Sequence, residues 1–219
     1  PVPSGTGPIW TPRSDTTHLA NPAMLPVFKR ADAKVGLGTI WSPSGSANMT
    51  RELSCAKQWN GYWGGDIFTD NELVNLATIN TAELTGYGAL IGELAVGKAA
   101  DITIWSTAAR DGLEAIINAE NKDIALVMRS GVALYGEADL VQSLAPADNC
   151  ESVDVCGETK RLCTQREFGM SLNDIIANVP ADASPLFVCG AWPNEQTCVA
   201  ERTTPDAYTG VASASDADG

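Results

Sequence analysis

The fold is decided by the stretch Val35-Gly36-Leu37-Gly38-Thr39-Ile40-Trp41-Ser42-Pro43-Ser44-Gly45-Ser46-Ala47-Asn48. Its first five residues are short, apolar and followed by turn residues, which is typical of a parallel strand covered on both faces. The glycines at 36 and 38 indicate a close approach of another part of the chain. The strand runs into a loop of serine, proline and glycine, and Ile40 stands at its tip.

A helix is predicted on each side of this strand. Residues 22–33 carry apolar side chains at Met24, Leu25, Val27 and Phe28, and residues 48–59 repeat the pattern. Asn48 suits the N-cap of the second helix, and Glu52 lies in its early turns, where the helix dipole favours an acid. The order helix, strand, loop, helix predicts a βα unit of an α/β fold, whose loops at the strand C-termini carry the chemistry in barrels.

These residues resemble a known family. Residues 38–46, followed by Glu52-Leu53, resemble the last barrel strand of the amidohydrolase superfamily, closest to its cytosine-deaminase-like and chlorohydrolase-like metal-dependent hydrolases. Further segments resemble that branch in order and spacing: 10–15, the preceding strand end; 70–74 and 77–82, a helix; and 91–105, the C-terminal signature and the most specific motif. The resemblance covers about residues 8–140. It implies the last βα units of a (β/α)8 TIM-type barrel, part of a β-sandwich domain, and a Cys-containing C-terminal extension.

Strand patterns in the second region agree with this resemblance. Strands are predicted over residues 91–95, 101–105, 124–129 and 132–135, with turns at Gly97-Lys98 and Ser130-Gly131. Strands joined through tight glycine turns form an antiparallel sheet. Asp101 is a candidate acid, but we interpret it as a sheet-edge or turn carboxylate.

The length of the chain indicates that it is only a part of such a barrel protein. A complete barrel needs ~250 residues, whereas this chain has 219 and begins at Pro1, with no signal peptide or transmembrane run. We therefore expect the C-terminal portion of a longer protein, whose partner is the N-terminal part of the barrel. The predicted divisions are 1–88 (barrel), 89–144 (composite β domain), 145–202 (Cys-containing extension) and 203–219 (disordered acidic tail).

The resemblance implies a divalent metal, most often zinc, at the barrel mouth. In the family, histidines from a His-x-His pair and two middle strands bind it, and an aspartate on the last strand completes the site and helps to deprotonate the bound water. This chain has a single histidine, His18, to which no family ligand corresponds. The aspartate position corresponds to Ile40, which can neither bind a cation nor accept a proton.

Three interpretations of Ile40 remain open. The protein is a degenerate member that kept the scaffold and lost hydrolysis; or Ile40 is an error or a deliberate change in this chain; or the histidines alone hold the metal and the enzyme works slowly. Asp15 lies at a neighbouring strand mouth, but an Asx turn or a helix cap is the simpler role for it.

Other polar residues near the predicted mouth are candidates for substrate or loop contacts. Arg13 could hold an anionic group, although such an arginine more often pairs with a nearby acid. We expect the loop serines mainly to order the loop, and no base accompanies them for nucleophilic catalysis. His18 is expected at the surface or at a helix cap. The full candidate set is Arg13, Ser14, Asp15, Ile40, Trp41, Ser42 and Ser44.

Six cysteines indicate the compartment. Cys55 suits an ordinary buried thiol, and the other five follow the signature: Cys150, Cys156, Cys163, Cys189 and Cys198. Their spacing does not match a zinc site, so disulfides are favoured, and with them an oxidising compartment. Since five is odd, one is free or pairs with Cys55. A secreted or periplasmic protein is predicted; a cytoplasmic one is the alternative.

The rest of the extension has little periodicity. A helix is predicted over residues 170–179, with Ser171 as the cap and Asp174 at the capping-box position, and a strand over 186–188. A net charge of −13, from 14 basic and 27 acidic residues, disfavours nucleic acid and anionic membranes. Homo-oligomerisation is left open.

Two functional classes, and a third outcome, follow from these observations. The first is a metal-dependent hydrolase that cleaves a C–N or C–Cl bond in a small cyclic or amide substrate, with this chain inactive by itself. The second is a non-catalytic binding or scaffold protein on the same fold. The third is a fragment without autonomous function, which would fold poorly alone.

Overall fold

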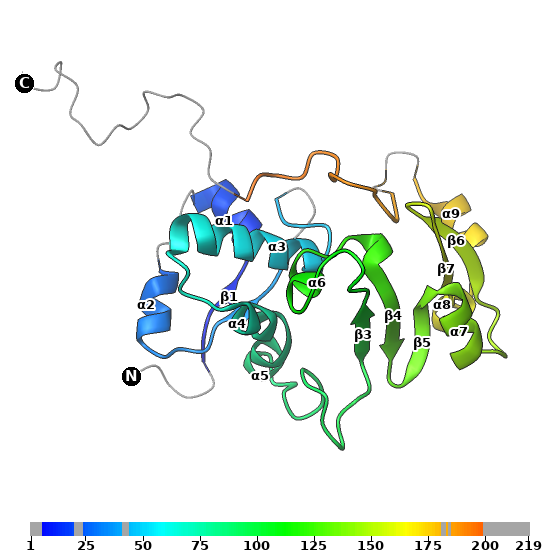
Figure 1. The fold of residues 1–219 in the computed structure, drawn as a ribbon, viewed down its shortest axis with the longest axis horizontal. Helices are drawn as coiled ribbons and strands as arrows, with labels where there is room; N and C mark the ends of the chain where they lie inside the picture. The colour runs from blue at the N-terminus through cyan, green and yellow to red at the C-terminus, as the bar shows by residue number, and fades with distance from the viewer. Residues whose placement is uncertain (1–5, 20–23, 41–43, 181–182, 184, 199–219) are drawn as a thin grey trace, which may run out of the picture.

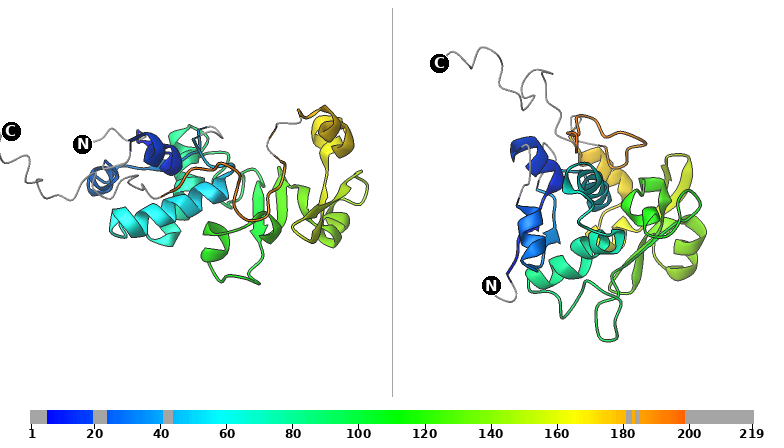
Figure 2. Two further views of the ribbon diagram at one scale, coloured as in Figure 1. Left: turned by 90° about the horizontal axis from the view of Figure 1, so that it is seen from above. Right: turned by 60° about the vertical axis from the view of Figure 1, so that its left-hand side comes forward.

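The computed structural model describes residues 6–19, 24–40, 44–180, 183 and 185–198. A helical part built around two short parallel strands lies beside an antiparallel sheet (Figure 1), and two further views show the same arrangement (Figure 2). The acidic tail predicted over residues 203–219 lies outside the described residues.

The helical part begins with strand β1 (Ile9–Trp10), which pairs in parallel with β2 (Gly36–Leu37). Helices surround this pair: α1 (Pro12–Leu19), α2 (Leu25–Arg30), α3 (Met49–Trp59), α4 (Asp70–Asn75) and α5 (Thr81–Leu84), with π-helical turns at Asn60–Gly64 and Leu76–Asn80. The predicted order of helix, strand, loop and helix is confirmed, although α2 and β2 are shorter than expected.

The two glycines of β2 are needed because other groups lie close to them. A Cβ on Gly36 would meet Thr81 Oγ1 at 2.6 Å and Ile9 Cδ1 at 2.7 Å, and one on Gly38 would meet Ile9 Cγ2 at 2.8 Å. Thr81 itself accepts a 2.9 Å hydrogen bond from the backbone N–H of Leu37. The close approach predicted from the glycines is therefore confirmed.

Aromatic side chains fill the core of the helical part. Trp10 meets Trp59 edge to face with ring centroids 5.1 Å apart and stacks with Phe68 at 6.2 Å. Leu37 and Leu73 are fully buried in the same cluster. These contacts bury Trp10 and Leu37, whereas Ile9 of β1 is exposed.

Asn48 caps α3 as predicted. Its side chain accepts a 3.0 Å hydrogen bond from the backbone N–H of Arg51. An N-cap of this kind satisfies one of the amide groups that a helix leaves unpaired at its start.

The sheet has five strands in the order β3-β4-β5-β7-β6, and each neighbouring pair is antiparallel. Its elements are β3 (Ile102–Trp105), α6 (Glu114–Ile117), a 3-10 turn (Asn121–Asp123), β4 (Ile124–Arg129), β5 (Val132–Glu137), α7 (Ala138–Leu144), β6 (Glu151–Val155), β7 (Glu158–Leu162), α8 (Thr164–Phe168) and α9 (Leu172–Asn178). The strands predicted near 101–105, 124–129 and 132–135 are confirmed.

Two predicted strands are wrong. Residues 91–95 form no strand, because the backbone turns locally: Ile91 N–H donates to Tyr87 O at 3.1 Å, and Gly92 adopts φ +101°. Residues 186–188 also form no strand. Instead, Phe187 stacks on Tyr135 at 5.7 Å, and Val188 O accepts from Asn121 Nδ2 at 3.2 Å.

The predicted turn at Gly97-Lys98 falls one residue earlier in the chain. Lys98 N–H donates to Ala95 O at 3.2 Å, so Val96 and Gly97 form the centre of the turn. Asp101 is a turn carboxylate, as interpreted, because its Oδ1 accepts a 2.7 Å hydrogen bond from Ser130 N–H.

The extension beyond residue 144 adds to the sheet. Strands β6 and β7 form a hairpin, and β7 pairs with β5 through Tyr135↔Leu162. The predicted helix over 170–179 is confirmed as α9, and Ser171 and Asp174 form its capping box. The division of the chain at residue 144 stays a prediction.

Three disulfides join all six cysteines: Cys55–Cys198, Cys150–Cys163 and Cys156–Cys189. The interpretation of Cys55 as an ordinary thiol is wrong, although the residue is buried. The open alternative is settled in favour of a bond between Cys55 and a cysteine of the extension. This bond fastens the end of the described chain to α3.

Candidate functional site

The candidate site lies where β1 and β2 end. Because the two strands are parallel, with Trp10 opposite Leu37, their C-terminal ends lie side by side. The start of α1 and the loop after β2 therefore meet there. Loops at the C-terminal ends of parallel strands form the active sites of barrel enzymes.

Glu52 is the residue that holds these loops together. Its side chain is fully buried, and its carboxylate accepts hydrogen bonds from the backbone N–H groups of Arg13, at 3.0 Å, and Ser46, at 3.1 Å. Burial raises the pKa of Glu52 above its usual range, although the hydrogen bonds from Ser46 and Arg13 act to lower it. The sequence analysis assigned Glu52 only to the helix dipole and missed this role in the loops.

The predicted serines order the loop, as expected. Ser44 Oγ lies 3.3 Å from Ser14 Oγ, and both residues are buried. Ser46 O accepts a 2.9 Å hydrogen bond from Thr39 Oγ1. Trp41 and Ser42, which were predicted in the same set, lie outside the described residues.

Arg13 pairs with an acid instead of pointing to solvent. Its Nε donates to Ser46 Oγ at 2.6 Å, its Nη2 lies 3.5 Å from Glu195 Oε2, and its Nη1 donates to Gln196 O. The side chains of Arg13 and Glu195 are each 7% exposed. Burial lowers the pKa of Arg13, while the charges of Glu195 and Glu52 act to raise it.

Glu195 was not predicted as a site residue, because nothing in the local sequence links it to Arg13. The neighbouring Arg13–Gln196 hydrogen bond joins residues that are 183 positions apart. Its carboxylate also accepts hydrogen bonds from Arg51 Nε, at 2.8 Å to each oxygen. Burial acts to raise the pKa of Glu195. The hydrogen bond from Arg51 and the charges of Arg13 and Arg51 outweigh burial and hold this pKa below its usual range.

The remaining predicted residues lie at the edge of the site. Asp15 accepts from Thr11 Oγ1 at 3.0 Å, so it serves the start of α1, as its simpler interpretation held. His18 is exposed on α1. Ile40 is 62% exposed at the end of β2, where the family would have its aspartate.

The described residues at these strand ends do not fit a catalytic metal. A hard cation needs carboxylate, imidazole or water ligands. The carboxylate of Glu52 is occupied by backbone N–H groups, and that of Glu195 is occupied by two guanidinium groups. Ile40 offers no ligand atom.

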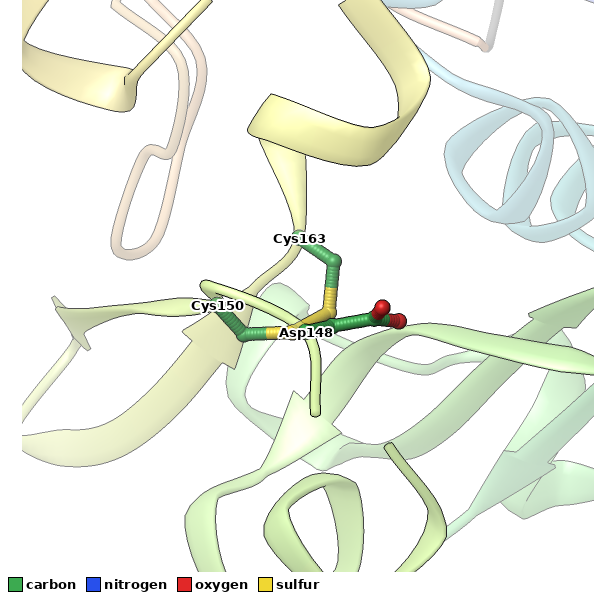
Figure 3. Close-up of side chains that lie close together, drawn as sticks. All are labelled: Asp148, Cys150 and Cys163. Carbon is green, nitrogen blue, oxygen red and sulfur yellow. A yellow bond between two sulfur atoms is a disulfide. The ribbon is translucent and has the colours of Figure 1, made fainter. Parts of the chain in front are cut away.

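One group of potential ligands lies elsewhere in the described chain. Asp148, Cys150 and Cys163 have ligand atoms within 4.8 Å of one another (Figure 3). The two sulfurs are joined in a disulfide, and Asp148 pairs with Arg166. Cysteine binds metals as a thiolate, and these two cysteines have no thiolate because they are joined in a disulfide. They therefore form a structural cross-link.

Among the described residues, no helix is both long and apolar enough to cross a membrane.

Two parallel strands whose following loops meet at their C-terminal ends form the arrangement of an α/β protein. Residues 22–134, more than half of the chain, match the profile of the Amidohydrolase family. The chain therefore belongs to the amidohydrolase family, as the resemblance of its motifs implied. A comparison with curated proteins gave no match.

Several solved structures are similar in fold, including two deaminases. One is an adenosine deaminase from Xanthomonas campestris with bound zinc, with 23% identity, a TM-score of 0.50, and coverage of 57% of this chain and 31% of that one. The other is the guanine deaminase of E. coli, with 22% identity, a TM-score of 0.50, and coverage of 61% and 35%. The chain thus spans about a third of the length of each structure, and the likeness supports a TIM-barrel-type fold with mixed α and β content.

Proposed function

We propose that this chain belongs to a metal-dependent hydrolase that cleaves a C–N bond in a small cyclic or amide substrate. The observation that carries the proposal is the family match over residues 22–134, which includes β2 and the loop that follows it. The two solved structures similar to it are a deaminase of adenosine and a deaminase of guanine, both of which act on C–N bonds. A C–Cl bond is the other chemistry that the resemblance implied.

The metal would have to be held by groups other than the described residues at the strand ends. Zinc is the candidate, because the adenosine deaminase contains it. Within this chain, Glu52 fixes the relative position of the two loops, and the serines order them. These residues shape the mouth of the site.

A non-catalytic binding or scaffold protein is the second candidate. It is supported by the resemblance, which implies an aspartate at the position of Ile40, and by the contacts of Glu195 and Gln196 with Arg13 at the strand ends. In this case the fold is kept and the hydrolytic step is lost.

Metal content and turnover of the full-length protein separate the two candidates. We would compare the wild type with Ile40→Asp, which restores a ligand and base, and with Ile40→Asn, which matches aspartate in size without its charge. Protein-bound zinc and ammonia release from aminated heterocycles are the readouts.

Zinc-dependent ammonia release that appears only with Ile40→Asp would support a degenerate hydrolase whose lost ligand lies at residue 40. Turnover in the wild type would support the hydrolase directly and would show that the family aspartate is dispensable. If none of the three proteins binds zinc or releases ammonia, the hydrolase proposal fails and the binding protein remains.

We propose an oxidising compartment, outside the cytoplasm, for this protein. Three disulfides join its cysteines, and disulfides of this kind are rare in the cytosol. We further propose that it binds neither nucleic acid nor anionic membranes, because its net charge is −13. Its partners would be a small-molecule substrate and the rest of the barrel. Light scattering, which measures molecular mass in solution, would test for a homo-oligomer.

A further inference from the structure

Residues 185–198 cross from the sheet to the helical part; we call this segment the strap. Figure 1 shows it in orange, running from the side of the sheet to α1 and α3. Disulfides hold it at two places: Cys189 bonds to Cys156 in the sheet, and Cys198 bonds to Cys55 on α3. Between these two bonds, the strap brings Glu195 to the ends of β1 and β2.

The Glu195 carboxylate lies among donors that all come from outside the strap. Arg51 Nε donates to both carboxylate oxygens at 2.8 Å, and Arg51 Nη2 also contacts Oε2. Arg13 Nη2 lies 3.5 Å from the same oxygen, and the backbone N–H of Ala47 donates to Oε1 at 3.4 Å. Guanidinium groups and backbone N–H groups that converge on one carboxylate are the usual parts of an anion site.

The donors come from segments that have hydrogen bonds of their own outside the strap. The backbone N–H of Arg13 is bound to Glu52, and its Nε is bound to Ser46. Arg51 belongs to the capped first turn of α3, and Ala47 lies between two residues that are themselves hydrogen-bonded, Ser46 and Asn48. The donor set therefore comes from the βα units; the strap supplies the Glu195 carboxylate that fills it and the Gln196 carbonyl that accepts a hydrogen bond from Arg13 Nη1.

There is also room beside the donor set. Arg13 and Arg51 line a cavity of about 400 Å³, which the strap borders with Gly190 and Ala191. Polar side chains, among them Asn118, line the rest of the cavity. A volume of this size lies in the range of small-ligand pockets.

We propose that Arg13, Arg51 and the Ala47 backbone N–H form a carboxylate-binding site that Glu195 fills as an internal ligand. A small-molecule carboxylate takes this place when the Glu195 side chain is absent or the strap is displaced. The proposal does not depend on the hydrolase function, since it concerns binding alone and its test measures no turnover.

The test adds acetate to the Glu195→Ala variant, in which the carboxylate of Glu195 has been removed. Glu195→Ala removes the Cγ methylene and the carboxylate, and acetate has the same composition as the deleted group. Sodium acetate is titrated into Glu195→Ala at pH 7, and sodium chloride of equal ionic strength is titrated in parallel; thermal unfolding is followed by circular dichroism. We expect a saturable rise in Tm with acetate, of about 3–6 °C at ten times the dissociation constant, and none of this size with chloride.

The matched control is Glu72→Ala. It makes the same deletion in the exposed pair with Lys29, whose side chains are 36% and 40% exposed. This variant and the wild type should respond to acetate no more than to chloride, and Arg51→Gln added to Glu195→Ala should abolish the response.

An equal response of Glu195→Ala to the two salts would overturn the proposal, as would an equal acetate response in Glu72→Ala or in the double variant. If Glu195→Ala does not fold in chloride, refolding in acetate becomes the readout. Recovery of the native circular dichroism spectrum in acetate alone supports the site, and failure to recover it counts against the site.

Discussion

Removal of the Cys55–Cys198 disulfide should destabilise this protein more than removal of either other disulfide. A disulfide limits the conformations of the unfolded chain, and this limit grows with the length of the loop that it closes. Cys55 and Cys198 are 143 residues apart, which corresponds to a loss of about 5 kcal/mol in the free energy of unfolding when both become alanine. Urea unfolding under non-reducing conditions, with linear extrapolation to water, measures this loss.

The matched control is the Cys150–Cys163 pair. Its cysteines are 13 residues apart, so the same calculation gives about 3 kcal/mol for their replacement by alanine. Both pairs are buried, so the cost of the lost sulfur atoms is similar and the difference between the variants reports loop length. If the Cys55/Cys198 variant loses no more stability than the Cys150/Cys163 variant, the reasoning from unfolded-chain entropy is wrong for this protein.

Three further substitutions test the strand ends. Glu52→Ala should reduce the free energy of unfolding by about 3–5 kcal/mol, since it leaves two buried N–H groups without an acceptor; urea unfolding against wild type measures this, and a loss below 1 kcal/mol would contradict it. The pKa of Glu195 is held low by its arginine partners, so its stabilisation is present above the unfolded pKa and is lost as pH falls through the folded pKa. The stability difference between wild type and Glu195→Gln should therefore shrink on acidification, and a constant difference between pH 7 and pH 3 would refute this. Gly36→Ala should cost about 1–3 kcal/mol, because its Cβ would lie 2.6 Å from Thr81 Oγ1; a Tm equal to that of wild type would contradict it.

The elements that could be predicted from sequence are those with local signals. Strand β4 matches its predicted bounds because an apolar run ends at a Ser-Gly turn. The caps of α3 and α9 were predicted at Asn48 and Ser171, because capping depends on residues within three positions of one another.

The β6–β7 hairpin was missed for a physical reason. Its strands, Glu151–Val155 and Glu158–Leu162, are mainly polar, so hydrophobic alternation gave no signal. Its turn is formed by Cys156 and Gly157, both with positive φ, and cysteine is an unusual residue for that conformation. The disulfide between Cys156 and Cys189 of the strap holds this turn, which could not be predicted from the local sequence alone.

The candidate site was predicted in part. Arg13, Ser14 and Ser44 do meet, because the parallel pairing of two recognisable strands brings their loops together. Glu195 could not be assigned to them, since its place depends on a long-range disulfide and not on any periodic pattern. Ion pairs between residues far apart in the sequence cannot be predicted from the spacing of residues along the chain.

The order in which the cysteines pair has a consequence for how the protein is made. Of these six cysteines, Cys55 emerges from the ribosome before the others and its partner Cys198 emerges after them. Bonds made in order of appearance would join each cysteine to the next along the chain, and none of those pairs occurs in the native protein. Any such sequential bond would have to be exchanged before the native pairs could form, and disulfide exchange without a catalyst takes minutes to hours.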